Sequence, residues 1–348
     1  MGAGSIASAL IFNSLPGLPL SPAIAQPSTP HPNQLSAHNF AQESLAEHHV
    51  ESDTSSTPGT SIPPSLEVEE VTLAPITVIS TGMEPRQILQ VRPTVNSQQE
   101  SVMTLDIMGT MTAEGRTQPL AQLPTTEMVM KTDVVRLDED GNRYIEFEYT
   151  EVTIGDTPGL PPEMNEAIQA QLSQLEGLSG RWVINEQGYI SQFTMTPPET
   201  TLVTIRQNIQ QMMDSLQQMS APFPTEAIGV GAQWQRPYQM SMNGVDMSGV
   251  AIYELVSVEG DRITLNTAVI QEGTAATFSA LPLPANVELS MQHMDSSGQG
   301  IIEMDLTEVM PIVSDMNLTS DSHFTIKVQD VEMPVSMNML VNLSLISE

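Results

Sequence analysis

The sequence predicts an α+β fold: a large curled antiparallel sheet, or half-barrel, with two helices packed on its concave face. From residue 101 onward, apolar and polar residues alternate in many short segments, which is the period-two pattern of strands with one buried face. Turn signals between consecutive segments favour hairpins, and hence antiparallel pairing. Two segments near the middle of the chain have helical spacing, and their apolar stripes need a large apolar partner such as the sheet.

Residues 1–25 are expected to form a secretory signal peptide. Ser5–Leu20 is apolar and rich in small residues, and Ala23-Ile24-Ala25 is an A-x-A cleavage pattern. The pattern departs from the usual one because no Lys or Arg precedes the apolar run. The predicted location is therefore periplasmic or extracellular. No later segment has 18 uninterrupted apolar residues, so no integral membrane span is expected.

Residues 26–99 are expected to be a disordered linker, and residues 100–348 to be the folded domain. The linker is rich in Pro, Ser, Thr, His and Glu, so it cannot bury enough apolar surface to offset the entropy lost on ordering. Within it, Leu66–Ile79 is a candidate edge strand. The cluster Glu47-His48-His49 is too isolated and flexible to predict a metal site.

Five strands are predicted in the first half of the domain. Asp140-Gly141 is a strong hairpin signal between the second strand and the third. A turn at Glu186-Gln187-Gly188 joins the fourth to the fifth. The predicted strands cover residues 101–111, 127–137, Tyr144–Ile154, Arg181–Asn185 and Tyr189–Met195.

Both predicted helices are amphipathic. The first, Pro162–Glu176, carries an apolar stripe and is followed by Gly177 at the position where helices commonly end. The second, Glu199–Met219, is bounded by Pro198 before it and Pro222 after it. Its stripe recurs every three or four residues and consists of Leu202, Ile205, Ile209, Met212, Met213, Leu216 and Met219.

Seven strands are predicted in the second half. Glu259-Gly260-Asp261 is expected to form one turn and Asp295–Gly298 another. The last strand has the clearest alternation, which is typical of a sheet with one packed and one wet face. The predicted strands cover residues 229–242, Val250–Val258, Arg262–Ile270, Val287–Met294, Ile301–Val309, His323–Val328 and Val335–Ile346.

Composition narrows the classes of partner. The formal net charge is −31, with 42 acidic residues against 11 basic ones, which argues against nucleic acid or an anionic membrane surface as a partner. Such a surface could instead hold divalent cations diffusely. Because the chain has no cysteine, disulfides, thiolate metal ligands and a Cys nucleophile are excluded. The 23 methionines, against 4% aromatic residues, predict a soft and adaptable core.

Signatures of catalysis are largely missing, since no G-x-S-x-G, H-E-x-x-H, P-loop or G-x-G-x-x-G helix motif occurs. His293 and His323 each lie two residues from an aspartate, Asp295 and Asp321, which leaves a Ser-His-Asp hydrolase as the third hypothesis. Asp138–Asn142 lacks the spacing of an EF-hand, so it is interpreted as a turn. We predict no enzyme activity, no cofactor and no resident metal.

The remaining candidate site is apolar. A plain filled core is the simpler interpretation of the Met-rich strands and helix, and the alternative is a deformable cavity between them that binds an apolar ligand. The residues assigned to this candidate cleft are Ile205, Ile209, Met212, Met213, Leu216, Met337, Met339 and Val341.

The order of signal peptide, linker and hairpin-rich domain with central helices resembles bacterial envelope proteins of the lipoprotein-carrier (LolA/LppX-like) architecture. The segments GVGAQW, GVAIYELVSVEGDRITL and GQGIIEMDLTEVMP are also similar to uncharacterised secreted bacterial proteins of that kind. The resemblance covers about residues 100–348. It implies an unclosed barrel whose concave face, plugged by helices, holds acyl chains or another apolar ligand. The lipobox cysteine of lipid-anchored members is absent.

Two main functional hypotheses follow. The first is a non-enzymatic secreted or periplasmic protein that binds a lipid or another apolar small molecule between sheet and helices. The alternative is a structural or interaction module of the cell envelope, with an acidic and cation-binding surface or exposed strand edges that contact its partners. Neither hypothesis specifies the oligomeric state.

Overall fold

The computed structural model describes residues 66–67, 75–120, 123–155, 162–198, 222–242, 245–277, 287–328 and 331–348. The predicted signal peptide, most of the predicted linker and the predicted helix Glu199–Met219 lie outside these ranges. The described residues all belong to one compact unit.

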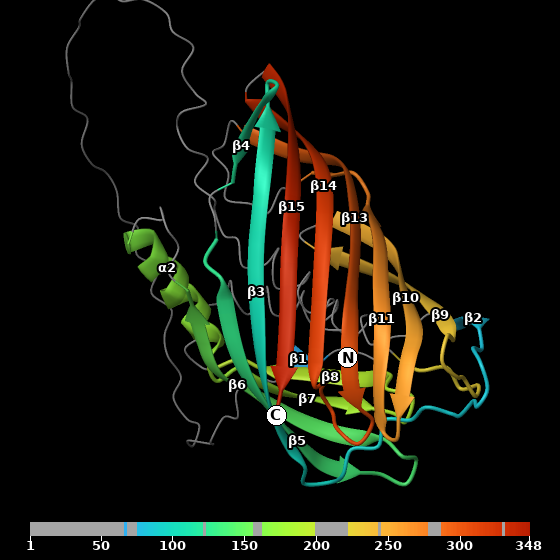
Figure 1. Cartoon of the computed structure of the whole chain (residues 1–348). Coiled ribbons are helices and arrows are strands. Elements are labelled where there is room, and N and C mark those ends of the chain that lie inside the picture. The colour runs from blue at the N-terminus through green and yellow to red at the C-terminus, as the bar shows by residue number, and fades with distance from the viewer. Residues whose placement is uncertain are drawn as a thin grey trace, which may run out of the picture. The chain divides into compact units, whose positions relative to one another are not determined.

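The described part of the chain is almost entirely β-structure, so the predicted α+β class with two helices on a concave face is wrong. It contains one α-helix, followed directly by a short 3-10 helix (Figure 1). The elements are β1 (Leu66–Glu67), β2 (Thr77–Ser80), β3 (Gln98–Ala113), β4 (Arg116–Pro119), β5 (Thr126–Leu137), β6 (Arg143–Ile154), α2 (Pro162–Leu172), η2 (Ser173–Leu175), β7 (Ser179–Ile184), β8 (Ile190–Thr196), β9 (Gln233–Met242), β10 (Val245–Glu259), β11 (Arg262–Gly273), β12 (Ala276–Thr277), β13 (Val287–Asp305), β14 (Val313–Val328) and β15 (Val331–Ser347).

The strands form one fifteen-stranded antiparallel sheet in the order β1-β8-β7-β6-β5-β3-β15-β14-β13-β11-β10-β9-β2. Two short strands lie outside this order: β4 pairs with β3, and β12 pairs with β13. Most neighbours are consecutive hairpins. The exception at the middle is β3, which pairs with the last strand, β15, from Ala113 opposite Val335 to Ser101 opposite Ser347.

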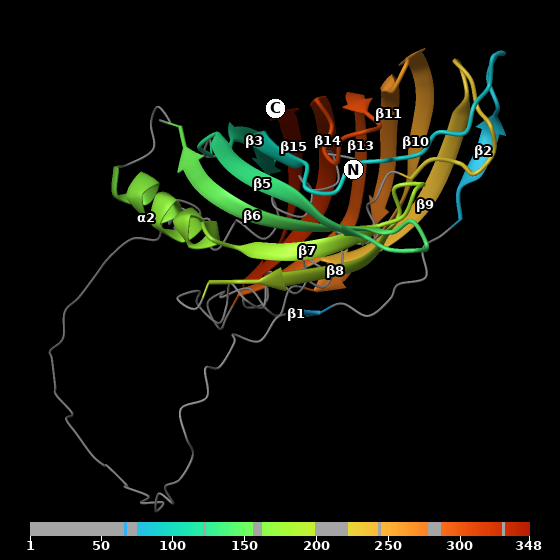
Figure 2. The same ribbon diagram turned by 90° about the horizontal axis from the view of Figure 1, so that it is seen from below.

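The sheet bends between β3 and β5. Only the first half of β3, residues 98–105, pairs with β5, because Leu105 is opposite Thr126, the first residue of β5. Figure 2 shows β5–β8 running across the direction of β9–β15. The inner faces of the two groups of strands contribute to one apolar core, in which Phe147 lies 4.9 Å from Trp182 and 5.8 Å from Phe193 between ring centroids. The sheet therefore buries its apolar face largely against itself.

A second aromatic group closes the core beside β9. Trp234 is 1% exposed, stacks on Tyr253 at 5.6 Å and lies 6.2 Å from Phe223. Its indole Nε1–H donates to the carbonyl of Pro222 at 3.2 Å, and the backbone N–H of Phe223 donates to Gln187 in the β7–β8 turn. Trp234 thus joins the two groups of strands through both packing and hydrogen bonds.

A tie segment, residues 81–97, connects the same two groups of strands. Its backbone N–H groups donate to Glu186 from Val91 (2.7 Å) and to Leu306 from Arg92 (2.6 Å). Leu89 and Val91 are buried in the core. This segment lies within the range expected to be a disordered linker, and that boundary needs correction because these apolar side chains give it enough buried surface to be ordered.

Three of the predicted turns are confirmed and one is wrong. Positive φ angles of 82°, 82° and 67° occur at Gly141, Gly188 and Gly260, in the β5–β6, β7–β8 and β10–β11 hairpins. The predicted turn at Asp295–Gly298 is instead the middle of β13, a continuous strand of 19 residues. Gly298 and Gly300 fit there because a Cβ at Gly300 would lie 2.2 Å from the carbonyl oxygen of Asp315 on β14. These glycines allow β13 and β14 to approach each other closely, and they do not form a turn.

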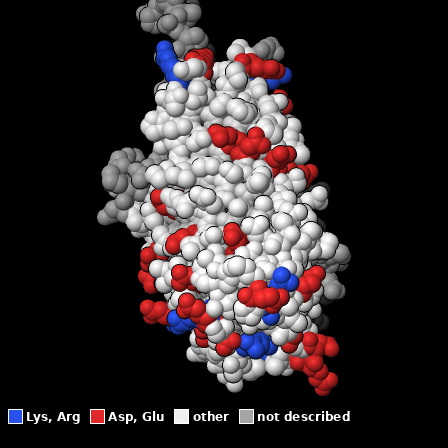
Figure 3. All heavy atoms as spheres, turned by 45° about the vertical axis from the view of Figure 1, so that its right-hand side comes forward, with Lys and Arg blue, Asp and Glu red and all other residues white. Residues whose placement is uncertain are grey.

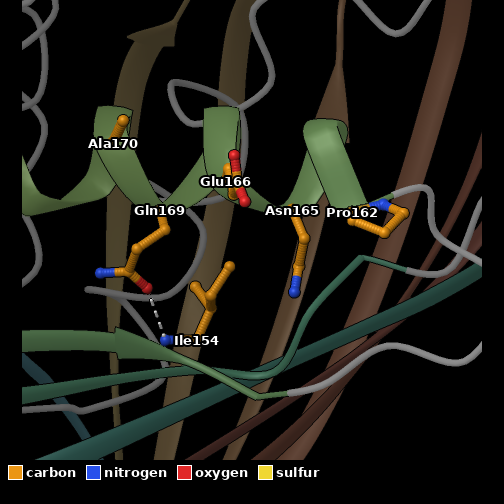
Figure 4. Close-up of a pocket in the computed structure, with 6 residues that line it drawn as sticks. All are labelled: Ile154, Pro162, Asn165, Glu166, Gln169 and Ala170. Carbon is orange, nitrogen blue, oxygen red and sulfur yellow. Dashed lines mark hydrogen bonds between the residues drawn. The ribbon is translucent and has the colours of Figure 1, made fainter.

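The predicted helix at Pro162–Glu176 is present as α2 and η2, but it does not cover the concave face. It packs beside β6, where β7 no longer pairs with it (Figure 2). The Gln169 amide donates to the carbonyl of Val152 at 2.9 Å and accepts from the N–H of Ile154 at 3.1 Å (Figure 4). The side chain of Gln169 thus takes the place of a neighbouring strand and protects this edge of β6.

Replacing Trp234 with Ala should lower the free energy of unfolding by about 3–5 kcal/mol, because it removes a fully buried aromatic side chain and leaves a cavity. Urea unfolding of the purified protein measures the loss. Ile270→Ala, at an outer position that is 56% exposed, is the control and should change stability by less than about 0.5 kcal/mol. Equal effects of the two substitutions would contradict the assignment of Trp234 to the core.

Gln169→Ala should weaken the β6 edge by about 1–2 kcal/mol, because two hydrogen bonds to β6 are lost. Hydrogen exchange at the Ile154 amide should then accelerate about tenfold. Gln174→Ala is the matched control, since within the described part of the chain the Gln174 side chain bonds to Ala170 of α2 and not to β6. Unchanged exchange at Ile154 in the Gln169 variant would show that the edge is protected in another way.

Candidate functional site

The two faces of the sheet differ sharply in chemistry. On β13, β14 and β15 the inward residues are apolar or small, and the outward ones are Ser, Thr, Asn, Gln, Asp and His with few exceptions. Figure 3 shows part of the outer surface, where acidic side chains form bands and the basic ones lie toward the top and bottom of the view. The outer face of the sheet is therefore the polar surface on which we look for a site.

A shallow, open groove of about 510 Å³ crosses this outer face over strands β9–β14. Two neighbouring cross-strand rows form it. In one row Ala268 pairs with Gln299, which pairs with Asn317; in the other, Asn266 pairs with Ile301, which pairs with Asp315. The further residues that line the groove are Gln233, Ile252, Tyr253, Glu254, Thr267 and Gly300.

The polar side chains of the groove, all on described residues, form no hydrogen bonds or ion pairs with one another. Within the described part of the chain, Asn266, Gln299, Asn317, Glu254 and Asp315 have no side-chain hydrogen bond or ion pair. Some comparable groups elsewhere on the outer face are paired, since Asp295 is bonded to His293 and Asp321 to Asn338. Amide and carboxylate groups without an internal partner leave both donors and acceptors free for a bound molecule.

The floor of the groove is apolar and rigid. Ile252, Ala268 and Ile301 lie between the polar groups, and the strands that carry them are paired on both sides. Tyr253 packs on the inner side, where burial raises the pKa of its hydroxyl to about 12 despite the opposing effect of Arg236, so this ring stays neutral at physiological pH. The lining side chains are thus held by a rigid sheet, with no loop among them.

An acidic row crosses the same face farther along the strands. Glu272 on β11 is opposite Asp295 on β13, which is opposite Asp321 on β14. The two aspartates have local partners: His293 Nε2 lies 2.8 Å from Asp295 Oδ2, and the Asn338 amide donates to Asp321 Oδ1 at 2.6 Å. Like charges directly opposite each other destabilise a sheet. No group of three or more His, Asp or Glu among the described residues has the arrangement of a metal site.

The two histidines singled out in the sequence come together. A bulge between Met291 and His293 turns His293 outward, directly opposite His323. The hydroxyl of Ser336 lies 3.0 Å from His323 Nδ1, whereas Asp295 is bonded to the other histidine. A catalytic triad needs one histidine between the serine and the aspartate, and this pairing does not supply it.

The Asp138–Asn142 segment forms a turn, as predicted. Asp138 accepts hydrogen bonds from the backbone N–H groups of Asp140 (3.1 Å) and Asn142 (2.8 Å), and from the Asn142 amide. Partial desolvation raises the pKa of Asp138, but these bonds and that of Tyr144 outweigh it and lower the pKa below its usual value. Its carboxylate is therefore used to hold the β5–β6 hairpin.

The apolar residues predicted to form a cleft are only partly described. Ile205, Ile209, Met212, Met213 and Leu216 lie outside the described residues. Met339 and Val341 are buried on the inner face of β15, and Met337 is half-buried there. The register places Met337 in an inner row with Met111, Met294 and Met247. The assignment of these residues to a ligand cleft stays a prediction.

A second hollow, of about 510 Å³, lies under α2. Figure 4 shows Gln169 and Asn165 pointing toward the strands, and Ala170 pointing away. The side-chain amide of Gln169 is hydrogen-bonded to the backbone of β6, as described above. We therefore assign this hollow to the contact between helix and sheet edge.

No family model matches the chain, and no curated protein does. Solved structures align over most of it at low similarity. They include Ail, the attachment invasion locus protein of Yersinia pestis (7% identity, 72% of this chain and 99% of that one, TM-score 0.15), and a loop-deletion mutant of OmpT, an outer membrane protein of Vibrio cholerae (4%, 73% and 100%, TM-score 0.16). A third is the outer membrane protein opdK from Pseudomonas aeruginosa (7%, 73% and 100%, TM-score 0.16).

These comparisons correct two expectations. The predicted resemblance to lipoprotein carriers, with a lipid or apolar molecule as the partner, is wrong: none of the three aligned structures above is such a carrier, and the described helix lies at the edge of β6, not on the concave face. The expectation of no integral membrane span is not supported by these comparisons, since two of the aligned proteins are named as outer membrane proteins, and it is not carried further. Among the described residues, no helix has both the length and the apolar character to cross a membrane.

TM-scores of 0.15 and 0.16 are far below those of proteins that share a fold, so no property of these three proteins is assigned to this chain. A cell-envelope location, which residues 1–25 predict, is compatible with such neighbours.

Sequence reasoning did not identify the groove residues. Asn266, Gln299 and Asn317 lie in three different strands, and nothing local marks them out from other polar residues on a wet face. Their signal is the pairing register, which brings positions 266, 299 and 317 onto neighbouring strands. A sequence shows the outward alternation of each strand but not the register between strands.

Glu272→Gln should stabilise the protein by a few tenths to about 1 kcal/mol at low salt, because it removes a like charge directly opposite Asp295. The gain should vanish in about 1 M NaCl, where such charges are screened. Thermal unfolding at the two salt concentrations measures it. Glu288→Gln is the control: Glu288 is opposite Lys327, so its loss should give no gain. A stabilisation that is independent of salt would contradict the electrostatic origin.

Proposed function

We propose that this protein is a non-enzymatic interaction module of the cell envelope, which binds its partner on the polar outer face of the sheet. The single observation that carries the proposal is the groove over β9–β14, whose amide and carboxylate side chains have no partner among the described residues. A binding site needs polar groups that are positioned but free, and the rigid strands of the sheet position these.

The distribution of polar groups supports binding over catalysis. His323 is exposed and Ser336 half-buried on the outer face of the sheet, and neither lines either of the two hollows described above. Among the described residues, no buried acid–base pair of the kind that general acid–base catalysis uses lies in the groove. The carboxylates there, Glu254 and Asp315, are on β10 and β14, three strand spacings apart, which is roughly 14 Å.

The predicted signal peptide supports the location. A protein exported to the envelope meets polymers and protein surfaces that are exposed to water, and a wet sheet face is suited to them. The acidic outer surface would repel polyanions, which agrees with the exclusion of nucleic acid.

Binding to the insoluble envelope fraction of the source organism tests the proposal. The full chain should co-sediment with this fraction, and the triple variant Asn266→Ala, Gln299→Ala, Asn317→Ala should bind at least about tenfold more weakly, because each lost hydrogen bond contributes about 1 kcal/mol. Ser297→Ala, Thr319→Ala, Asn338→Ala is the matched control, with three outward polar residues of the same sheet outside the groove. Equal co-sedimentation of the two triple variants would refute the proposal.

A further inference from the structure

The groove is longer than a single small ligand needs. Its lining runs from Glu254 on β10 through Asn266 and Ile301 to Asp315 on β14. Three strand spacings of about 4.8 Å give a length of roughly 14 Å, and the groove runs across the strands, not along them. A metal ion or a monosaccharide would contact only part of it, so the groove fits an extended chain.

The lining combines two kinds of contact. Asn266, Gln299 and Asn317 present planar amides that donate and accept hydrogen bonds side by side. Ile252 and Ile301 present small apolar surfaces between them. A sugar ring has hydroxyl groups at its rim and C–H groups on its faces, so it can use both kinds of contact at once.

Other extended polymers fit less well. The strands under the groove are paired on both sides, so a peptide cannot add to them as a further strand. No Lys or Arg lines the groove, whereas Glu254 and Asp315 do, so nucleic acids and anionic polysaccharides would be repelled. A basic peptide is the remaining competitor, but the three central polar groups, Asn266, Gln299 and Asn317, are uncharged.

We infer that the groove across β10, β11, β13 and β14 binds an extended, uncharged oligosaccharide or polysaccharide chain, with Gln299 and Asn317 as its central hydrogen-bonding residues. The inference rests on the proposed function, because it assigns a ligand class to the same site. Gln299 and Asn317 are cross-strand partners, and both side chains are exposed. They are placed to contact adjacent hydroxyl groups of one sugar unit.

Isothermal titration calorimetry of the full chain tests this inference, with cellohexaose, laminarihexaose, chitohexaose and maltohexaose as probes. At least one of them should bind, and at least about tenfold more tightly than its monosaccharide, because only the longer chain fills the groove. Gln299→Ala and Asn317→Ala should each weaken that binding about tenfold. Ser297→Ala and Thr319→Ala, at the next outward positions of the same strands, are the controls and should leave it within about twofold.

A heparin hexasaccharide and an oligo-arginine peptide complete the panel. The inference is overturned if none of the four neutral hexasaccharides binds, if binding survives in both groove variants, or if only the peptide or the heparin fragment binds. Co-sedimentation separates these outcomes from failure of the proposed function. Envelope binding that is lost in the groove variants, without affinity for a neutral glycan, would refute the ligand class and leave the interaction module in place.

Discussion

The structure depends on one constraint: a single antiparallel sheet has to bury its own apolar face. Among the described residues, the only α-helix, α2, caps the edge of β6 and leaves that face to the strands themselves. The sheet therefore bends between β3 and β5, so that β5–β8 cross β9–β15 and the two groups of strands share one core. Trp234 and the tie segment hold the two groups together with both apolar contacts and backbone hydrogen bonds.

The same constraint explains the outer face. Because most apolar residues of a half-buried strand point inward, the outward positions are free to be polar, and neighbouring strands arrange them in rows. Two of these rows behave differently. In the acidic row, Asp295 and Asp321 are each bonded to a neighbour, His293 and Asn338. In the groove the polar side chains have no such bonds among the described residues, so their hydrogen-bonding capacity is directed to solvent or to a ligand.

Local patterns in the sequence were sufficient for most of the strands and hairpins, because alternation and Asp-Gly or Gly-containing turns are local properties. These patterns failed where residue types that are typical of one structure serve a different purpose in another. Asp295–Gly298 has the composition of a turn, but in β13 its glycine permits close approach to β14. The stripe in Pro162–Glu176 predicted a helix correctly but not its place at the β6 edge. The groove could not be predicted, because it exists only in the register of β11, β13 and β14.

The pairing of β3 with β15 has a consequence for how the molecule can be made. The two strands at the centre of the sheet are β3, the first long strand, and β15, the last one. Almost the whole domain separates them along the chain. The hairpins on either side can form early from local contacts, but they stay two separate halves until the C-terminal residues are available. Closing so large a loop is slow compared with hairpin formation. The centre of the sheet is thus its last part to be completed during synthesis, and an incomplete chain would expose both halves of the interface.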